Sequence, residues 1–277
     1  MRVITANKIR HLIADLSIQA NTVLRKDVLA QLKSAYAKEI NARAKKILGA
    51  IMANAGIAKR QKLAICQDTG LPVVFLEIGQ DIKIDGDLKS AINKGIELGY
   101  KKGYLRNSII NDPLSRGKPG YAPAVIHTDM VRGNKLKITV LPKGFGCENK
   151  TQLKMFNPTA GIDEIKKFVV EAVKFAGPDA CPPYVVGVGI GGTADYACFL
   201  AKKALLRGLS TERYTLYAKL ESDLLKKINK LNIGPMGLGG RTTCLGVNIQ
   251  TYPTHIAGLP VAVNISCHAL RSANKTL

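Results

Sequence analysis

Residues 63–79 read LAICQDTGLPVVFLEIG, and the rest of the chain can be arranged around this stretch. An apolar run leads into Cys66, a polar cluster follows, and a β-rich run resumes at Leu71. A turn needs only one or two residues with turn propensity, so a thiol, an amide, a carboxylate and a hydroxyl in succession indicate a loop that carries chemistry. The alternative is an ordinary strand–turn–strand with a half-buried cysteine, and this segment alone leaves both interpretations open.

The residues before this stretch predict helices. Apolar residues recur at helical spacing over 4–60, with a break at Asn21 and Thr22 and a third helix over 42–54 that ends near Gly56. Residues 1–16 read as an amphipathic helix without a small-residue cleavage site, so we predict no signal peptide and a cytoplasmic protein. No segment approaches about 18 uninterrupted apolar residues, so we expect no membrane span.

The residues after the stretch predict alternating helices and strands. Asp87 can cap a helix that runs to about residue 105, residues 111–124 are too rich in proline and glycine for a regular element, and 124–141 predict a hairpin that turns at 132–134. Further helices are expected over 162–175, 194–206 and 214–231, and further strands over 242–252 and 259–267.

A glycine-rich segment, G-x-G-x-G-G at 187–192, is expected to form a loop that opens the helix 194–206. It departs from the G-x-G-x-x-G spacing of dinucleotide-binding folds, and no acidic residue closes a following strand, so we reject that fold. The predicted class is α+β (mixed α/β) in a single domain, 1–277. An N-terminal helical module, 1–60, precedes an antiparallel or mixed sheet with strand–glycine loop–helix units over 61–277.

The charge balance is strongly basic. The 277 residues include 41 Lys and Arg against 20 Asp and Glu, a net charge of +21. Such an excess favours nucleic acid, anionic substrates or an acidic partner subunit. There is no Trp, only 5% of residues are aromatic and the lysines are spread along the chain, so nucleic-acid binding has no motif behind it.

The six cysteines fall into three groups by context, and none forms the closely spaced pair of a zinc finger or a bacterial ferredoxin. Cys198 and Cys244 fit core packing, and Cys147 has charged neighbours in a loop. Three others each stand where an apolar strand meets a loop, and they are Cys66, Cys181 and Cys267. These three are either separate buried thiols or ligands that the fold unites around a soft metal or an iron–sulfur cluster.

Six motifs identify a family. They are ICQDTG (65–70), LRNS (105–108), PKGFGCENK (142–150), ACPPYVVGVGIGGT (180–193), GLGGRTT (237–243) and ISCHALR (265–271). In this order they resemble the α subunit of the class I (iron–sulfur) fumarate hydratases, a family that also includes L(+)-tartrate dehydratase. The sequence departs from the family at Cys147, where Ser is frequent, and at Leu259, where many members carry an extra Cys.

The resemblance implies an oxygen-sensitive [4Fe-4S] cluster held by Cys66, Cys181 and Cys267, with the fourth iron open to substrate. It also implies a set of substrate-binding and catalytic residues around that cluster. The substrate contacts would come from Gln67, Asp68, Arg106, Gly144 and Gly146, and the catalytic residues would be Asp68 and His255. Asp68 is either an acid–base group or an orienter, and the sequence does not choose between the two.

The implied activity is reversible hydration of fumarate to (S)-malate. The chain stops soon after its last motif, so the resemblance implies that a separate β subunit carries the rest of the active site, in an α2β2 assembly. One alternative is the L(+)-tartrate dehydratase α subunit, with another small dicarboxylate as substrate. An alternative of another class is a non-catalytic basic iron–sulfur or nucleic-acid-binding protein.

Overall fold

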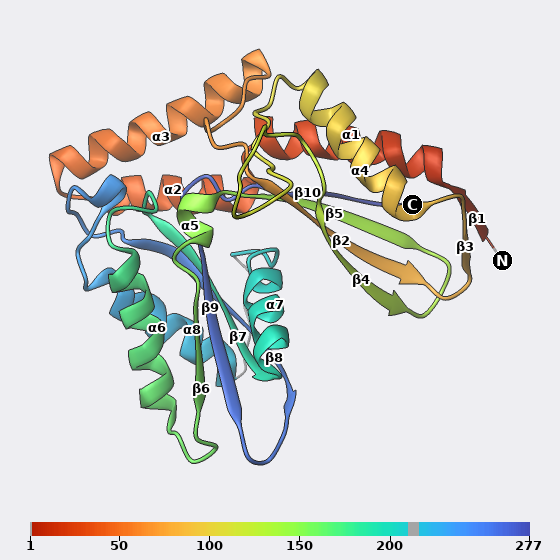
Figure 1. The fold of residues 1–277 in the computed structure, drawn as a ribbon. Coiled ribbons are helices and arrows are strands. Elements are labelled where there is room, and N and C mark those ends of the chain that lie inside the picture. Colours follow the sequence, from red (N-terminus) through yellow and green to blue (C-terminus); the bar gives the residue numbers. More distant parts are fainter. Residues whose placement is uncertain (1, 210–215) are drawn as a thin grey trace. The chain divides into compact units, whose positions relative to one another are not determined.

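A computed structural model describes residues 2–209 and 216–277 (Figure 1). The chain divides into two compact units, each built from segments that are far apart in the sequence. The first unit comprises Met1–Leu24, Asn54–Phe145 and Arg271–Leu277, and the second comprises Arg25–Ala53 and Gly146–Leu270. Helices and mixed sheets occur in both units, which confirms the predicted α+β class. Over the described ranges, we find no helix that is long and apolar enough to cross a membrane.

The first unit contains a four-stranded sheet with the order β10-β5-β2-β4. Its strands are β2 (Leu71–Gly79), β4 (Val125–Val131), β5 (Leu136–Lys143) and β10 (Ala273–Thr276). The predicted hairpin of β4 with β5 is wrong, because β2 lies between them, parallel to β4 and antiparallel to β5. The continuous apolar sequence of β2 explains this, since a strand buried on both faces belongs in the middle of a sheet.

Two helices of the first unit pack against each other and against this sheet (Figure 1). They are α1 (Ala6–Thr22) and α4 (Leu88–Lys102), and Asp87 caps α4 as predicted, accepting the Ser90 N–H at 2.9 Å. The helices approach closely at Gly99, where an added Cβ would lie 2.6 Å from the Ala14 carbonyl oxygen. Their shared core is apolar and includes Ile9, Ile13, Ile92 and Ile96 from the helices and Val74, Leu76, Ile138 and Val140 from the sheet.

The helical N-terminal pattern is confirmed with two corrections. Besides α1, it contains α2 (Lys26–Lys38) and α3 (Ala42–Gln61). First, Arg2–Thr5 is not helical but forms β1, which pairs in parallel with β3 (Ile82–Asp85). Second, α3 does not end near Gly56. It continues to Gln61, and Lys62 then adopts the left-handed conformation (φ 55°) that often ends a helix.

The second unit contains a sheet with the order β6-β9-β7-β8. Helix α7 (Ala194–Ala204) covers one face, and α6 (Ile162–Ala176) and α8 (Leu216–Asn229) cover the other (Figure 1). Successive side chains of β9 point to opposite faces of the sheet, so Val263 packs in the core with α6 and α8, whereas Ala262 packs against α7. Residues 214 and 215 of the predicted helix 214–231 lie outside the described residues. The strands are β6 (Gln152–Phe156), β7 (Tyr184–Gly192), β8 (Cys244–Thr254) and β9 (Leu259–Ser266).

The predicted glycine loop at 187–192 is wrong, because these residues are the second half of β7. Their glycines make room for α7. An added Cβ would lie 2.1 Å from the carbonyl oxygen of Ala201 at Gly187, and 2.1 Å from that of Ala197 at Gly189. Glycine within a strand commonly marks such a close backbone approach. The helix that follows begins at Ala194, as predicted.

Candidate functional site

Residues 66–70, the CQDTG loop, join the end of α3 to β2 in the first unit. No strand precedes Cys66, contrary to the strand–turn–strand alternative. The buried Thr69 accepts the backbone N–H of Arg106 through its Oγ1 at 3.0 Å. The Tyr100 hydroxyl lies 3.0 Å from the carbonyl oxygen of Thr69 and 3.1 Å from that of Gly70, and burial raises the pKa of this phenol. Thr69 therefore ties the loop to the LRNS segment, and Tyr100 ties the loop to helix α4.

Asp68 is the most extensively bonded residue of the CQDTG loop. Its Oδ1 accepts the Gly70 N–H at 2.9 Å, and its Oδ2 accepts the Phe145 N–H at 2.8 Å. The Arg271 guanidinium donates to its backbone carbonyl oxygen. An added Cβ at Gly144 would lie 3.3 Å from Oδ2, which accounts for the small residue at that position. Both carboxylate oxygens are thus used to fix the backbone around them.

The first unit brings five of the predicted site residues together. Cys66 is half-buried, and its thiol lies 3.2 Å from the side-chain oxygen of Gln67. The side chains of Gln67 and Arg106 are exposed. An amide and a guanidinium therefore stand beside a thiol on a backbone that Asp68 and Thr69 fix. Exposed donors on a fixed backbone can bind a carboxylate, and the planar guanidinium of arginine suits two parallel hydrogen bonds.

The second unit brings Cys181 and Cys267 together. Cys181 precedes β7 and Cys267 follows β9, and these strands are antiparallel with Val185 opposite Ser266, so both cysteines lie at the same end of the sheet. His268 joins the two segments. Its backbone N–H donates to the Cys181 carbonyl oxygen at 3.4 Å, and its ring Nδ1 lies 3.1 Å from the same oxygen.

Two hydrogen bonds that the sequence did not predict hold the segment around Cys181 in place. The buried thiol of Cys147 donates to the Ala180 carbonyl oxygen at 3.3 Å. The backbone N–H of Met236, in the short helix η1 (Pro235–Gly237), donates to the Pro182 carbonyl oxygen at 2.8 Å. Cys181 itself has a φ of 57°, in the left-handed region that few residues other than glycine adopt. Met236 directly precedes the GLGGRTT motif (237–243), which carried no predicted role, and Gly237 of that motif packs against Pro178.

Two further predicted site residues, His255 and Gly146, belong to the second unit. His255 lies exposed between β8 and β9, where its Nδ1 accepts the Ala257 N–H at 3.2 Å. Cys267 follows the other end of β9, whose eight residues (Leu259–Ser266) span about 25 Å, so the second unit does not bring His255 to its thiols. Gly146 lies exposed in α5 (Phe145–Glu148), with open space where a Cβ would stand.

The donor set suits an iron–sulfur cluster in its chemistry. All six cysteines carry thiols, and thiolates are the ligands of such clusters. Cys66, Cys181 and Cys267 are half-buried, whereas burial raises the pKa of the Cys244 thiol to about 12, which keeps it protonated at neutral pH. The described part of neither unit contains by itself a group of three or more His, Cys, Asp or Glu side chains that could hold a metal ion. Cys66 lies in the first unit, and Cys181 and Cys267 lie in the second.

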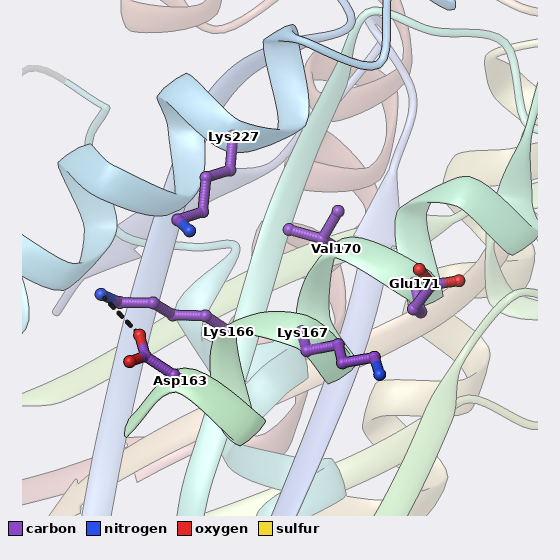
Figure 2. Close-up of a pocket in the computed structure, with 6 residues that line it drawn as sticks. All are labelled: Asp163, Lys166, Lys167, Val170, Glu171 and Lys227. Atoms are coloured by element: carbon purple, nitrogen blue, oxygen red, sulfur yellow. Dashed lines mark ion pairs between the residues drawn. The ribbon is translucent and has the colours of Figure 1, made fainter. Parts of the chain in front are cut away.

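A separate pocket opens between α6 and α8 in the second unit. Figure 2 shows its lining, in which Lys166 of α6 points to Asp163 and Lys227 extends from α8. Its volume is about 440 Å³, and Lys166 also forms an ion pair with Asp223 at 2.7 Å. None of the predicted site residues lines this pocket. Part of the excess of basic residues therefore lies on α6 and α8, which contain none of the six motifs.

A family model described as fumarate hydratase (fumerase) matches residues 10–276, almost the entire chain. The class of protein is therefore that of the fumarate hydratase hydro-lyases. The chain belongs to this family, as its six motifs predicted.

Relatives with similar sequences cover the chain from end to end. A protein of Methanocaldococcus jannaschii named "Putative L(+)-tartrate dehydratase subunit alpha" is 42% identical over 279 residues, which are 98% of this chain and 98% of that protein. The L(+)-tartrate dehydratase subunit alpha of Escherichia coli (strain K12) is 30% identical over 270 residues, covering 96% of this chain and 89% of that protein.

Proposed function

We propose that this chain is the α subunit of a hydro-lyase that reversibly adds water to the double bond of a small dicarboxylate, with fumarate and (S)-malate as the reacting pair. Membership of the family and the construction of the CQDTG loop support the proposal. The observation that carries it is the bond of the Thr69 hydroxyl to the Arg106 backbone at 3.0 Å, which fixes an exposed guanidinium beside a loop rich in polar groups.

In this proposal the residues of the first unit bind and orient the substrate. Arg106 holds one carboxylate through its planar guanidinium, and the Gln67 amide donates a further hydrogen bond. Asp68 acts as an orienter of the loop rather than as the acid–base group, because both of its carboxylate oxygens accept backbone N–H groups. Fixing the diacid in one orientation reduces the entropic part of the barrier to reaction.

We further propose that Cys66, Cys181 and Cys267 hold a [4Fe-4S] cluster. Such a cluster with one open iron would supply a Lewis acid for the hydroxyl that enters or leaves. The half-buried thiols of Cys181 and Cys267, at one end of the second unit's sheet, support this ligand set. The cluster would also make the enzyme sensitive to oxygen.

A partner subunit forms part of the proposal. Both relatives described above are named as alpha subunits, so we infer a β subunit that supplies further active-site groups, including the catalytic base. The net charge of +21 suits an acidic partner surface. Since His255 lies about 25 Å from Cys267 along β9, we propose that it serves the active site of a second copy of this chain, in an α2β2 assembly.

A second candidate is L(+)-tartrate dehydration on the same scaffold, which the names of the relatives favour. The test is anaerobic reconstitution of the chain with its β subunit and iron, followed by assays with fumarate and with L(+)-tartrate under identical conditions. A higher kcat/KM for fumarate supports the first candidate, and a higher value for tartrate supports the second. Bound iron without turnover of either would instead favour a non-catalytic iron–sulfur protein.

A further inference from the structure

Arg271 is a buried arginine that the resemblance leaves without a role. It closes the ISCHALR motif and is only 4% exposed, in the first unit. Its guanidinium donates to the carbonyl oxygen of Asp68, two residues after Cys66. Its Nε, which is buried, has no hydrogen-bond partner among the residues that the structure describes. One of its donors is therefore unused next to the CQDTG loop.

Two half-buried arginines, Arg25 and Arg207, each have a carboxylate partner. The Arg25 guanidinium lies 2.5 Å from the Asp27 carboxylate, and Arg207 forms an ion pair with Glu221. Within the ranges 2–209 and 216–277, no ion pair includes Arg271. A buried guanidinium bonded only to a neutral carbonyl is costly, because nothing nearby replaces the water that stabilised its charge.

Two neighbours define the surroundings of this charge. The phenol of Tyr100 is close enough to Arg271 and to Asp68 to be influenced by both charges. The carboxylate of Asp68 is already directed toward the N–H groups of Gly70 and Phe145. The positive charge of Arg271 thus has no ion-pair partner among the described residues, although it adjoins the loop that we propose binds a diacid.

We infer that Arg271 is a positioning residue whose buried positive charge stabilises a small dicarboxylate bound at the CQDTG loop. The inference rests on the proposed function and deepens it, because it assigns one source of the affinity for a dianion. Arg271 acts in two ways. Its hydrogen bond fixes the backbone of Asp68, and its charge acts through a poorly screened interior, where a nearby anion interacts more strongly than in water.

Two substitutions separate the charge from the hydrogen bond. R271Q keeps an amide donor for the Asp68 carbonyl and removes the charge, whereas R271K keeps the charge on a flexible donor. R10Q is the matched control. Arg10 belongs to the first unit and also has a buried Nε without a partner among the described residues, but it lines a different hollow, with Asn7 and Asp87.

The experiment measures binding of succinate, a diacid that cannot react, to the anaerobically reconstituted α–β protein by calorimetry. It also measures the thermal unfolding midpoint of the α chain without ligand. We expect R271Q to weaken succinate binding about tenfold, R271K to bind more tightly than R271Q, and R10Q to match the wild type. The ligand-free midpoint of R271Q should not fall, because an uncompensated buried charge has been removed.

The inference is overturned if R271Q binds succinate as the wild type does. It is also overturned if R271Q fails to fold, or lowers the ligand-free midpoint without rescue by R271K, since Arg271 would then be structural. A wild type that does not bind succinate overturns it too. The proposed function can fail separately. Charge-dependent succinate binding without turnover of fumarate or tartrate refutes the reaction, whereas turnover with unaltered binding in R271Q refutes only the role of Arg271.

Discussion

The CQDTG loop of the first unit and the Cys181 segment of the second unit are held in place in different ways. Side chains fix the CQDTG loop, through the carboxylate of Asp68, the hydroxyls of Thr69 and Tyr100, and the guanidinium of Arg271. The Cys181 segment is held at its own backbone carbonyl oxygens, which the Cys147 thiol and the His268 ring also contact, and by close packing. The N–H groups of His268 and Met236 donate to it, and Gly237 packs against Pro178.

This difference indicates what each region is built to do. A loop held by polar side chains presents further polar groups, which suits recognition of a carboxylate. A segment held through its backbone leaves its thiol available for another bond. Substitutions of polar side chains should therefore disturb the first region most, and substitutions of glycine should disturb the second. The following predictions test that contrast, beginning with the largest expected effect.

Substituting Cys181 by Ser should abolish the cluster, because the proposed site would retain only two thiolates. Iron per chain and the visible absorption after anaerobic reconstitution measure the loss, and activity should disappear with them. C244S is the matched control, since its buried thiol has a pKa raised to about 12 and is not a ligand in the proposal. Unchanged iron content in C181S would refute this ligand assignment.

The substitution R106K should reduce kcat/KM for the diacid about 10- to 100-fold, because lysine keeps the charge but cannot form the paired hydrogen bonds of a guanidinium. The unfolding midpoint should not change, since the Arg106 side chain is exposed and its backbone N–H still donates to Thr69. R116K, in the exposed segment after α4, controls for a general effect of the exchange. Equal kcat/KM in R106K and the wild type would remove Arg106 from the binding site.

Gly237 provides the test of the second region. Alanine there would combine a φ of 75° with a Cβ only 2.2 Å from the Pro178 Cβ, and we expect a loss of about 3 kcal/mol in the free energy of unfolding. G239A is matched to it, because Gly239 has a φ of 80° with open space around its Cβ, and it should lose about 1 kcal/mol. Urea unfolding followed by circular dichroism compares them. Equal losses would show that packing against Pro178 contributes nothing.

The smallest expected effect concerns Tyr100. Its folded-state pKa is raised by burial above the ordinary value of 10.0, so the unfolded chain releases this proton first as the pH rises. The stabilisation from the neutral phenol is therefore complete below pH 10 and is lost progressively above it. Y100F should lose about 1 kcal/mol near neutral pH, and its stability should fall less steeply above pH 10 than that of the wild type. If the stability of Y100F and of the wild type fell equally with pH above 10, the Tyr100 phenol would not be the source of this pH dependence.

Much of the local structure was predictable from the sequence because it depends on neighbouring residues. The cap at Asp87, the helix over 162–175 and the strand from Leu71 follow from capping and apolar spacing. The wrong predictions concern contacts between elements that are far apart in the sequence. The apolar run of β2 and the glycines of β7 indicate burial and close approach, but neither pattern identifies the partner strands or the partner helix. The last strand, β10, was missed for the same reason, since its four residues (Ala273–Thr276) pair with β5.

The candidate site shows the same division. The motifs named Gln67, Asp68, Arg106 and Gly144, and the structure groups them in one unit with Cys66. Tyr100 lies in no motif and Arg271 only closes the ISCHALR motif, so neither had a predicted role until the fold showed that both are buried. His255 is the opposite case, because the family resemblance predicted a role for it but the structure separates it from Cys267 by the length of β9.

By itself, the sequence determined the family, the α+β class and the identity of the chemical groups, because short motifs and local periodicity record them directly. The tertiary structure alone decided which strands are neighbours, which thiols share one end of a sheet, and that both oxygens of Asp68 fix the backbone. The physical reason is that pairing and burial depend on contacts between residues distant in the chain. No single segment contains both partners of such a contact.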